Sequence, residues 1–312
     1  MAIIPQQTLF VWSEIEELGD LERLRMVIEN MPDEELMEVL ERERGKKGRD
    51  DYPVRAVWNT VLAGVVFQHP TIESLRRELS RNAQLRYMCG LYGSGKKAIP
   101  SEWAYTRFIK KLFKHEEEIE KIFNKLVREL KEVLPGYGKE LAMDSKAIES
   151  LSKRKNKNEK ADGRRDTDAN WGVKEYRGTR EDGTTWEKIK MWFGYKLHLI
   201  VDANYELPVA YELTKASSSD VKEGHKLIEK LKGKQPEIIG GCETLAADRG
   251  YDDTKLITKL YDKHGIKPVI DIRNVWKDPD PTRQLEGYDN IVYDYKGSVY
   301  CYCPETGERR EM

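Results

Sequence analysis

Cysteine is scarce in this chain, with four residues among 312. Disulfide-held secreted scaffolds need a much denser supply, so the count excludes that class and favours a reducing compartment. Long apolar runs are missing as well, since no segment approaches the roughly 20 apolar residues of a membrane helix. The opening MAIIPQQTLFVWSEIEELGD has no basic segment followed by an apolar run. We therefore expect no secretory signal, no membrane partner and a cytoplasmic location.

An excess of one charge is also absent, because 54 Lys and Arg stand against 55 Asp and Glu, for a net charge of −1. This balance excludes the simplest signature of a nucleic-acid-binding protein, a high overall pI. Any binding of DNA must come from local basic patches. The hydrophobic fraction of 39% still permits a normal core, and 312 residues suit two domains.

The first part of the chain shows helical periodicity throughout. Apolar residues recur at helical spacing between Leu21 and Leu40, and residues 54–67 form the most hydrophobic run. A further apolar stripe covers residues 119–133 and ends at Pro135-Gly136. These patterns predict an all-α N-terminal domain over residues 1–136.

The pattern then changes to strands mixed with helices. Strands are expected at 140–150, 193–203, 206–216, within 237–253, and at 266–273, with helices at 217–234 and 252–265. Helical crossovers between strands of like direction predict a mixed α/β sheet with flanking helices over residues 137–273. The tract 151–190 is charge-rich and low in apolar residues, so it is expected to be an insertion. Short strands rich in Tyr, Asp and Gly are expected at 274–312.

Two aspartates stand at the ends of predicted strands. Asp144 ends LAMD and Asp248 ends LAAD. Paired carboxylates at neighbouring strand ends suit a hard divalent cation such as Mg²⁺, and bound ions of this kind assist phosphodiester chemistry. Without a cation, two like charges held close together repel each other. The competing interpretation is that each aspartate only caps the turn after its strand.

Three segments in order carry a family resemblance: LAMDSKAIES, GYKLHLIVDANYELPVAYELTKASSSDVKEG and LAADRGYDD. Together they resemble the catalytic core of bacterial insertion-sequence transposases of the DDE type. The upstream segments DYPVRAVWNTVLAGVVFQHPTIESLRRELSRNAQLRYMCGL and IPSEWAYTRFIKKL are similar to the helical domain that precedes that core. The resemblance covers residues 50–273, and extends more weakly to 312.

The resemblance implies an RNase H-like mixed sheet in which Asp144 and Asp248 are the first two catalytic acids and ligands of Mg²⁺ or Mn²⁺. Arg249, Gly250 and Tyr251 follow as in the family, and Gly250 is expected to permit a tight turn beside the metal. The third acid of the family is a glutamate on a helix after the fifth strand, often beyond an insertion. None of the tail glutamates lies on a convincing core helix, so none is assigned: Glu305, Glu308 and Glu311.

No helix is predicted after the last core strand, which would leave one face of the sheet uncovered. We therefore expect a chain truncated at its C-terminus, inside a β-rich insertion, or cover from a partner subunit.

Basic residues near the predicted helices and the insertion are the candidates for DNA contacts, since neutralised phosphates give salt-dependent binding. Solvated loops or helix faces are the alternative interpretation. The candidates are Arg107, Lys110, Lys111, Lys153, Arg154, Lys155, Arg164, Arg165 and Arg249. Three aromatic residues of the insertion could stack on an unpaired base near a DNA end: Trp171, Tyr176 and Trp186.

Other polar residues receive ordinary interpretations. Cys301 and Cys303 form C-x-C, half of the ligands that a zinc site needs, so two free thiols are expected. His198 alternates with apolar residues and is expected to be buried with its hydrogen bonds satisfied. His225 follows a predicted helix start, and the sequence alone does not decide whether it lies near the acids. Asp202 is expected to serve the turn after its strand.

The predicted function is that of a DNA transposase. It would nick insertion-sequence ends and transfer the freed strand to target DNA, bind terminal inverted repeats through its N-terminal helices, and pair two ends as a homodimer. Two alternatives stay open: a catalytically dead DNA-binding remnant, and an RNase H-like nuclease.

Overall fold

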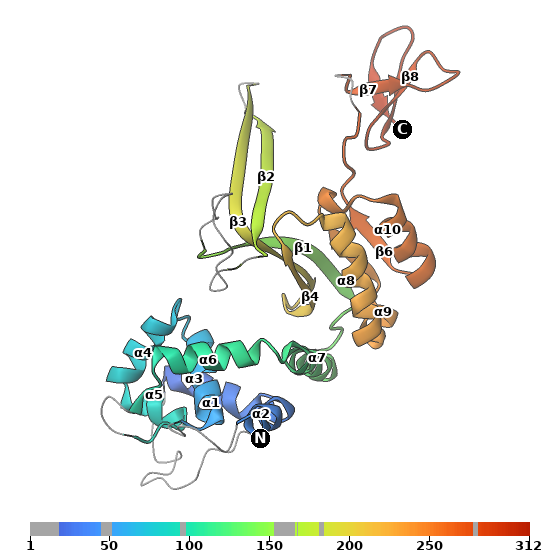
Figure 1. Ribbon diagram of the computed structural model, residues 1–312. Helices are drawn as coiled ribbons and strands as arrows, with labels where there is room; N and C mark the ends of the chain where they lie inside the picture. The colour runs from blue at the N-terminus through green and yellow to red at the C-terminus, as the bar shows by residue number, and fades with distance from the viewer. Residues whose placement is uncertain are drawn as a thin grey trace. The chain divides into compact units, whose positions relative to one another are not determined.

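The computed structural model describes residues 19–44, 52–93, 98–152, 166, 168–180, 184–276 and 280–312, with the backbone alone for 176–179. The chain divides into two compact units, Met1–Glu129 and Leu130–Met312, each taken by itself below (Figure 1). Across these described ranges no helix has the length and apolar character needed to cross a membrane.

The first unit is helical, as the periodicity predicts. Its helices are α1 (Asp20–Asn30), α2 (Glu34–Arg42), α3 (Val54–Val66), α4 (Ile72–Arg81), α5 (Ala83–Met88), α6 (Glu102–Leu112) and α7 (Glu116–Val133), the last of which runs into the second unit. Thr71 caps α4 by accepting from the Ser74 backbone N–H, and Ser101 caps α6 by accepting from that of Ala104.

Polar contacts fix the core of this unit. Tyr105 of α6 is fully buried and donates a hydrogen bond to the Thr60 hydroxyl of α3 at 2.8 Å. Asp33, just before α2, is 1% exposed and accepts from both Arg55 and Trp58 of α3. These two buried side chains therefore have partners, and their contacts tie α2 and α6 to the apolar helix α3.

The second unit is built on a mixed sheet. Its strands are β1 (Glu140–Glu149), β2 (Asn170–Thr179), β3 (Thr185–Asp202), β4 (Pro208–Lys215), β5 (Thr244–Ala247) and β6 (Lys267–Ile270). The order is β2-β3-β1-β5-β6, and β4 pairs with β3. β1 is antiparallel to β3 and parallel to β5, and β5 is parallel to β6. The predicted fold class is confirmed: a mixed α/β sheet preceded by an all-helical region.

Helices cover one face of this sheet. α8 (Asp220–Lys234) buries Leu227, Ile228 and Leu231, and α9 (Pro236–Gly241) and α10 (Thr254–Thr258) follow it around β5. A 3₁₀ turn, η3 (Arg249–Tyr251), lies between β5 and α10, and the π-helical turn η4 (Lys259–Lys263) continues α10. On the opposite face Leu213 and Val269 stay 54% and 52% exposed.

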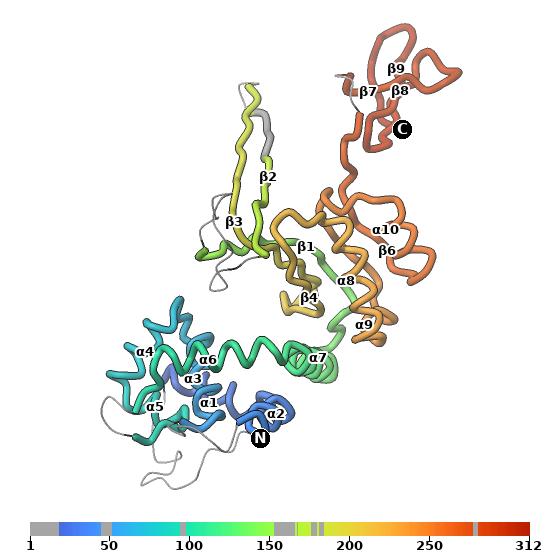
Figure 2. The backbone as a smooth tube through the Cα atoms, viewed as in Figure 1, coloured from blue at the N-terminus to red at the C-terminus, as the bar shows by residue number. Residues whose placement is uncertain are grey.

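The structure refines two features of the sequence prediction. The tract 151–190 is predicted to be a charge-rich insertion, and the structure adds that it contains all of β2 and the first part of β3, which pair as a long antiparallel ribbon (Figure 2). The strand predicted within residues 237–253 is β5, only four residues long, and the residues before it form the short helix α9, which Pro236 opens.

The tail folds as a second sheet, in line with the expected short strands. It is ordered β10-β9-β8-β7, from β7 (Thr282–Gln284), β8 (Ile291–Asp294), β9 (Val299–Tyr302) and β10 (Arg309–Glu311).

Candidate active site

Asp144 and Asp248 occupy neighbouring strands in the same register. The parallel pairing of β1 with β5 joins Ala142 to Ala246 and Met143 to Ala247. One more step along this register places Asp144 opposite Asp248, whose backbone is still extended at φ −72° and ψ 168°. Paired strands lie about 4.8 Å apart and opposed residues point to the same side, so the two carboxylates share one face.

The expectation that Asp144 ends its strand is wrong. β1 continues to Glu149 and pairs with β3 along its whole length, with Asp144 opposite Leu199. β5 stops at Ala247, opposite Met143, so from Asp144 onward β1 is no longer paired with β5. It stays paired with β3 on its other side. Asp144 therefore lies in mid-strand, at the point where the sheet opens.

Both carboxylates are exposed, and their recorded contacts are to backbone N–H groups. Asp144 accepts from the N–H of Ser145 at 2.6 Å, and Asp248 accepts from the N–H of Gly250 at 2.8 Å. A Cβ at position 250 would come 2.7 Å from the same Asp248 oxygen, so glycine permits this tight turn, as predicted.

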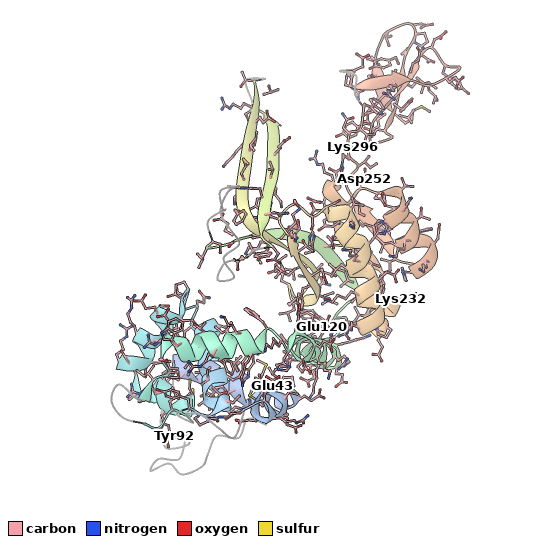
Figure 3. The ribbon with its side chains drawn as sticks, in the orientation of Figure 1. Glu43, Tyr92, Glu120, Lys232, Asp252 and Lys296 are labelled. Carbon is pink, nitrogen blue, oxygen red and sulfur yellow. The ribbon has the colours of Figure 1, made fainter. Side chains whose placement is uncertain are left out.

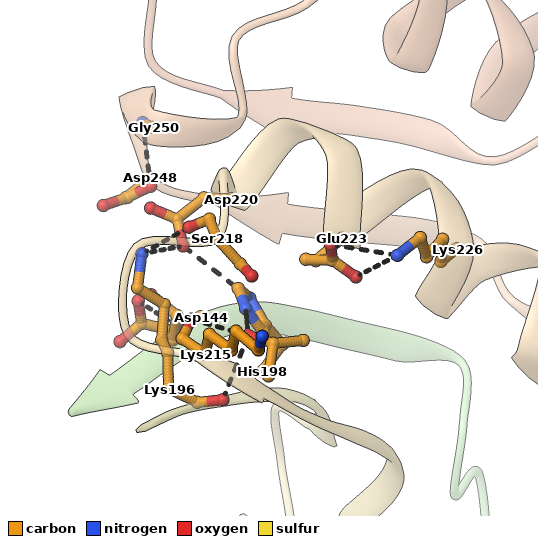
Figure 4. A network of polar contacts seen from close by, with 12 residues as sticks. Asp144, Lys196, His198, Lys215, Ser218, Asp220, Glu223, Lys226, Asp248 and Gly250 are labelled. Atoms are coloured by element: carbon orange, nitrogen blue, oxygen red, sulfur yellow. Dashed lines mark hydrogen bonds and ion pairs between the residues drawn. The ribbon is translucent and has the colours of Figure 1, made fainter. Parts of the chain in front are cut away.

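A buried cation sits next to this pair (Figure 4). Lys196 of β3 is 7% exposed and donates to Asp220 at the start of α8 at 3.1 Å and to the carbonyl of Ser218 at 2.9 Å. His198, two residues along β3, has Nδ1 3.6 Å from the same Asp220 oxygen. In the close view Asp220 lies between Asp144 and Asp248.

His198 is buried, as predicted. Its Nε2 is 3.0 Å from the Thr214 hydroxyl of β4, and burial lowers the pKa of the imidazole. The neutral ring is therefore favoured inside the sheet, and His198 serves as a packed polar residue beside Asp220.

Tyr251 connects the three carboxylates electrostatically. It is 1% exposed, and its hydroxyl has no hydrogen-bond partner within the described residues. Burial raises the pKa of this phenol first of all, and the negative charges of Asp220, Asp144 and Asp248 raise it further. The charges of the three aspartates thus act on the same buried phenol.

A third acidic ligand is not found beside them. Within the ranges given above, no group of three or more His, Cys, Asp or Glu side chains is arranged to hold a metal ion. Glu308 precedes β10 and Glu311 lies on it, in the separate tail sheet, and Glu305 lies in the turn before it. These glutamates remain unassigned.

Three other residues of interest have structural partners. Asp202 is fully buried at the end of β3 and accepts from the N–H groups of Gly138, Asn204 and Tyr205, which is the predicted turn role. His225 contacts the Asp253 carboxylate at 3.0 Å. Asp253 caps α10, so this histidine is directed to a helix terminus.

All four cysteines are free thiols. Cys301 lies on β9 and Cys303 follows that strand. This agrees with the expected free thiols.

The candidate DNA-binding residues fall into three groups. Arg107 and Lys110 are exposed on α6, whereas Lys111 is half-buried and reaches the carbonyl of Glu43 at 3.4 Å. Arg249 is exposed next to Asp248, 3.8 Å from Asp271. Five candidates lie outside the described residues: Lys153, Arg154, Lys155, Arg164 and Arg165.

The roles of Lys196 and Asp220 and the burial of Tyr251 are not predicted from the sequence. The sequence does hold a sign of the position of Lys196. Lys196 and His198 alternate with Leu197 and Leu199, so both basic side chains share one face of β3. Asp220 reads as an ordinary helix start, and only the tertiary fold brings it to Lys196.

Two families of transposase domains match the chain. The transposase DDE domain family matches residues 140–296, which include both aspartates. A second transposase domain family, DUF772, matches residues 12–111. No curated protein sequence matches the chain.

One solved structure, a piggyBac transposase synaptic complex with hairpin DNA, is similar at 12% identity and a TM-score of 0.41. The match covers 95% of this chain and 60% of that one, so this chain spans less than two thirds of that transposase. With the DDE domain matched over half of its residues, the chain belongs to the DDE-domain transposase family.

Proposed function

We propose that this protein cuts DNA at the ends of an insertion sequence and transfers the freed strand to target DNA, with Asp144 and Asp248 as its first two catalytic acids. The observation that carries the proposal is their shared register on β1 and β5, which sets two exposed carboxylates side by side. The sheet order β4-β3-β1-β5-β6 supports an RNase H-like core.

The donor set fits a hard divalent cation. Asp144 and Asp248 offer carboxylate oxygens, which Mg²⁺ and Mn²⁺ prefer, and the only contacts recorded for them are to backbone N–H groups. When bound, such a cation supplies charge stabilisation for phosphodiester cleavage and lowers the pKa of a bound water.

The chain's own groups would position these acids. The Gly250 N–H holds one oxygen of Asp248, and Lys196 pairs with Asp220 and so compensates the charge of that carboxylate. The phenol of Tyr251 is neutral near pH 7, as an ordinary tyrosine is, and burial raises its pKa further, so it adds no negative charge beside the acids.

DNA would reach the site through positive and aromatic surfaces. On α6, Arg107 and Lys110 are exposed together with Trp103, and Phe113 and Lys114 are exposed directly after it, the two aromatic residues each at 74%. A helix face of this kind suits a DNA groove, and we assign it to the terminal inverted repeats. A homodimer would then pair two ends, in a bacterial cytoplasm and at the nucleoid.

Strand-transfer assays test the proposal. The protein would be given DNA ends of its own element with Mg²⁺ or Mn²⁺, and Asp144→Asn and Asp248→Asn are each expected to lower nicking and joining by at least about 100-fold. Asp262→Asn, at an exposed carboxylate of η4, is the matched control and should keep full activity. Nicking that persists in Asp144→Asn would overturn the assignment.

The absence of a three-acid group in the described ranges favours one competing function, a DNA-binding protein without catalysis. DNA-end binding with no nicking in either metal would support it. An RNase H-like nuclease would instead cleave RNA–DNA hybrids with no preference for inverted repeats.

A further inference from the structure

The ribbon is the most prominent part of the second unit that the proposed site does not use. It consists of residues 170–179 of β2 paired with 185–194 of β3, from Asn170 opposite Gly194 to Thr179 opposite Thr185. Ten residues per strand give a length of roughly 34 Å. Figures 1 and 2 show it extending away from the strands that carry Asp144 and Asp248.

Its two faces differ in charge. The register places Lys174, Lys188 and Lys190 on one face, called the lysine face, and the ten positions of that face include no acidic residue. The ribbon's two acidic residues, Glu175 and Glu187, both fall on the opposite face. That opposite face also carries four exposed apolar side chains, Trp171, Val173, Ile189 and Met191, whereas the exposed Trp186 lies on the lysine face.

The lysine face is electrostatically unfavourable in the protein alone. Lys174 and Lys190 are direct cross-strand partners, and like charges in this position destabilise a β-pair. Lys188 and Lys190 are exposed, with no ion pair recorded in the described part of the chain. A polyanion lying on this face would convert the repulsion into attraction.

The ribbon is anchored rigidly at its base. Trp192 is 3% exposed and lies over Gly172, where an added Cβ would come 2.3 Å from the indole. The Trp192 N–H donates to the carbonyl of Tyr195 at 2.9 Å. At Gly194, where φ is +153°, a Cβ would meet the Ile148 carbonyl at 2.2 Å, so β3 can pass closely over β1 there.

The lysine face continues along β3 to Lys196 and His198. β3 is one continuous strand, and the side that presents Lys188 and Lys190 is the side that presents Lys196 and His198 farther along. Lys174 donates to the carbonyl of Ser145 at 3.2 Å, one residue from Asp144. Lys174 therefore contacts β1 beside Asp144, whereas Asp144 itself lies opposite Leu199, on the other side of the sheet from Lys196 and His198.

We propose that the lysine face of the ribbon binds the phosphate backbone of the duplex DNA on which the proposed active site acts. This inference rests on the proposed function, because it takes DNA as the substrate. A two-stranded ribbon fits the major groove, which is about 12 Å wide, and lysines on one side of it face the flanking phosphates.

The test is the salt dependence of binding. The full chain would be titrated with a DNA duplex in EDTA at several salt concentrations, so that binding is measured without catalysis. Lys188→Ala/Lys190→Ala is expected to weaken binding and to reduce the slope of log K against log salt by about 1.8, since each lost phosphate contact removes about 0.9. The matched double variant Lys232→Ala/Lys255→Ala removes two exposed lysines of α8 and α10 and should leave the slope unchanged (Figure 3).

A second readout separates binding from folding. Lys190→Thr should raise or maintain the Tm without DNA, because it removes the like-charge pair, while it weakens DNA binding. An unchanged slope in a folded Lys188→Ala/Lys190→Ala protein would overturn the ribbon proposal and leave the proposed function standing. A wild-type chain that binds no DNA would overturn both.

Discussion

Lys196 and Asp220 form an ion pair of 3.1 Å in which the lysine side chain is 9% exposed and the aspartate 27%. Removal of Asp220 should therefore cost more than removal of Lys196. Asp220→Ala leaves a buried ammonium with the Ser218 carbonyl, at a loss of about 2–3 kcal/mol in the free energy of unfolding. Lys196→Met leaves an aspartate that water can reach, at a loss of about 1 kcal/mol. Urea unfolding measures both, and equal losses would contradict the asymmetry.

Gly172 and Gly233 should respond in opposite directions to alanine. At Gly172 the new Cβ collides with the Trp192 indole, so Gly172→Ala is expected to lower the free energy of unfolding by about 2 kcal/mol. A Cβ added at Gly233 would meet no neighbouring side chain or segment within 4 Å, and the residue is helical in α8. Gly233→Ala should therefore raise the free energy of unfolding by about 0.5–1 kcal/mol. Thermal unfolding of the two variants provides the comparison, and a neutral Gly172→Ala would show that the ribbon base is mobile.

The sequence predicts the parts of the fold that bury one regular face. α4 and α7 have apolar residues at helical spacing, and β4 follows the turn at Asp202, so each is found near its true position. The ribbon fails this criterion, because both its faces are largely exposed and its strands mix Lys, Glu and Trp. Its pairing rests on backbone hydrogen bonds between strands, which leave little trace in hydropathy.

The candidate site is predicted only in part for a similar reason. Asp144 and Asp248 follow short apolar runs, which makes each visible as an acid after a strand. Their shared register depends on the pairing of β1 with β5, and the place of Asp220 depends on the packing of α8. These are long-range relationships that one sequence does not encode locally.

His198 should make stability depend on pH. Burial lowers the pKa of its imidazole from the ordinary 6.5, so the unfolded chain binds this proton more readily than the folded one. The contribution of the neutral ring is complete above pH 6.5 and falls as the pH drops below 6.5 toward the folded-state pKa. His198→Gln removes this titration and should flatten the decline in Tm between about pH 7 and 5. If the Tm of His198→Gln declines as much as that of the wild type, other groups cause the decline. His264 is one such group, because burial also lowers its pKa.

The cysteines should react in a fixed order. Hydrogen bonds from Thr306 lower the pKa of the Cys303 thiol, whereas burial raises the pKa of Cys89 to about 12 and that of Cys242 to about 11. The thiolate is the reactive form, so at about pH 8 a thiol reagent should modify Cys303 before either buried cysteine. Mass spectrometry of partly labelled protein identifies the site. Cys303→Ser should remove the early product and Cys89→Ser should not, while unfolding in urea should abolish the order. Early labelling of Cys89 in the folded chain would contradict its burial under α3 and α5.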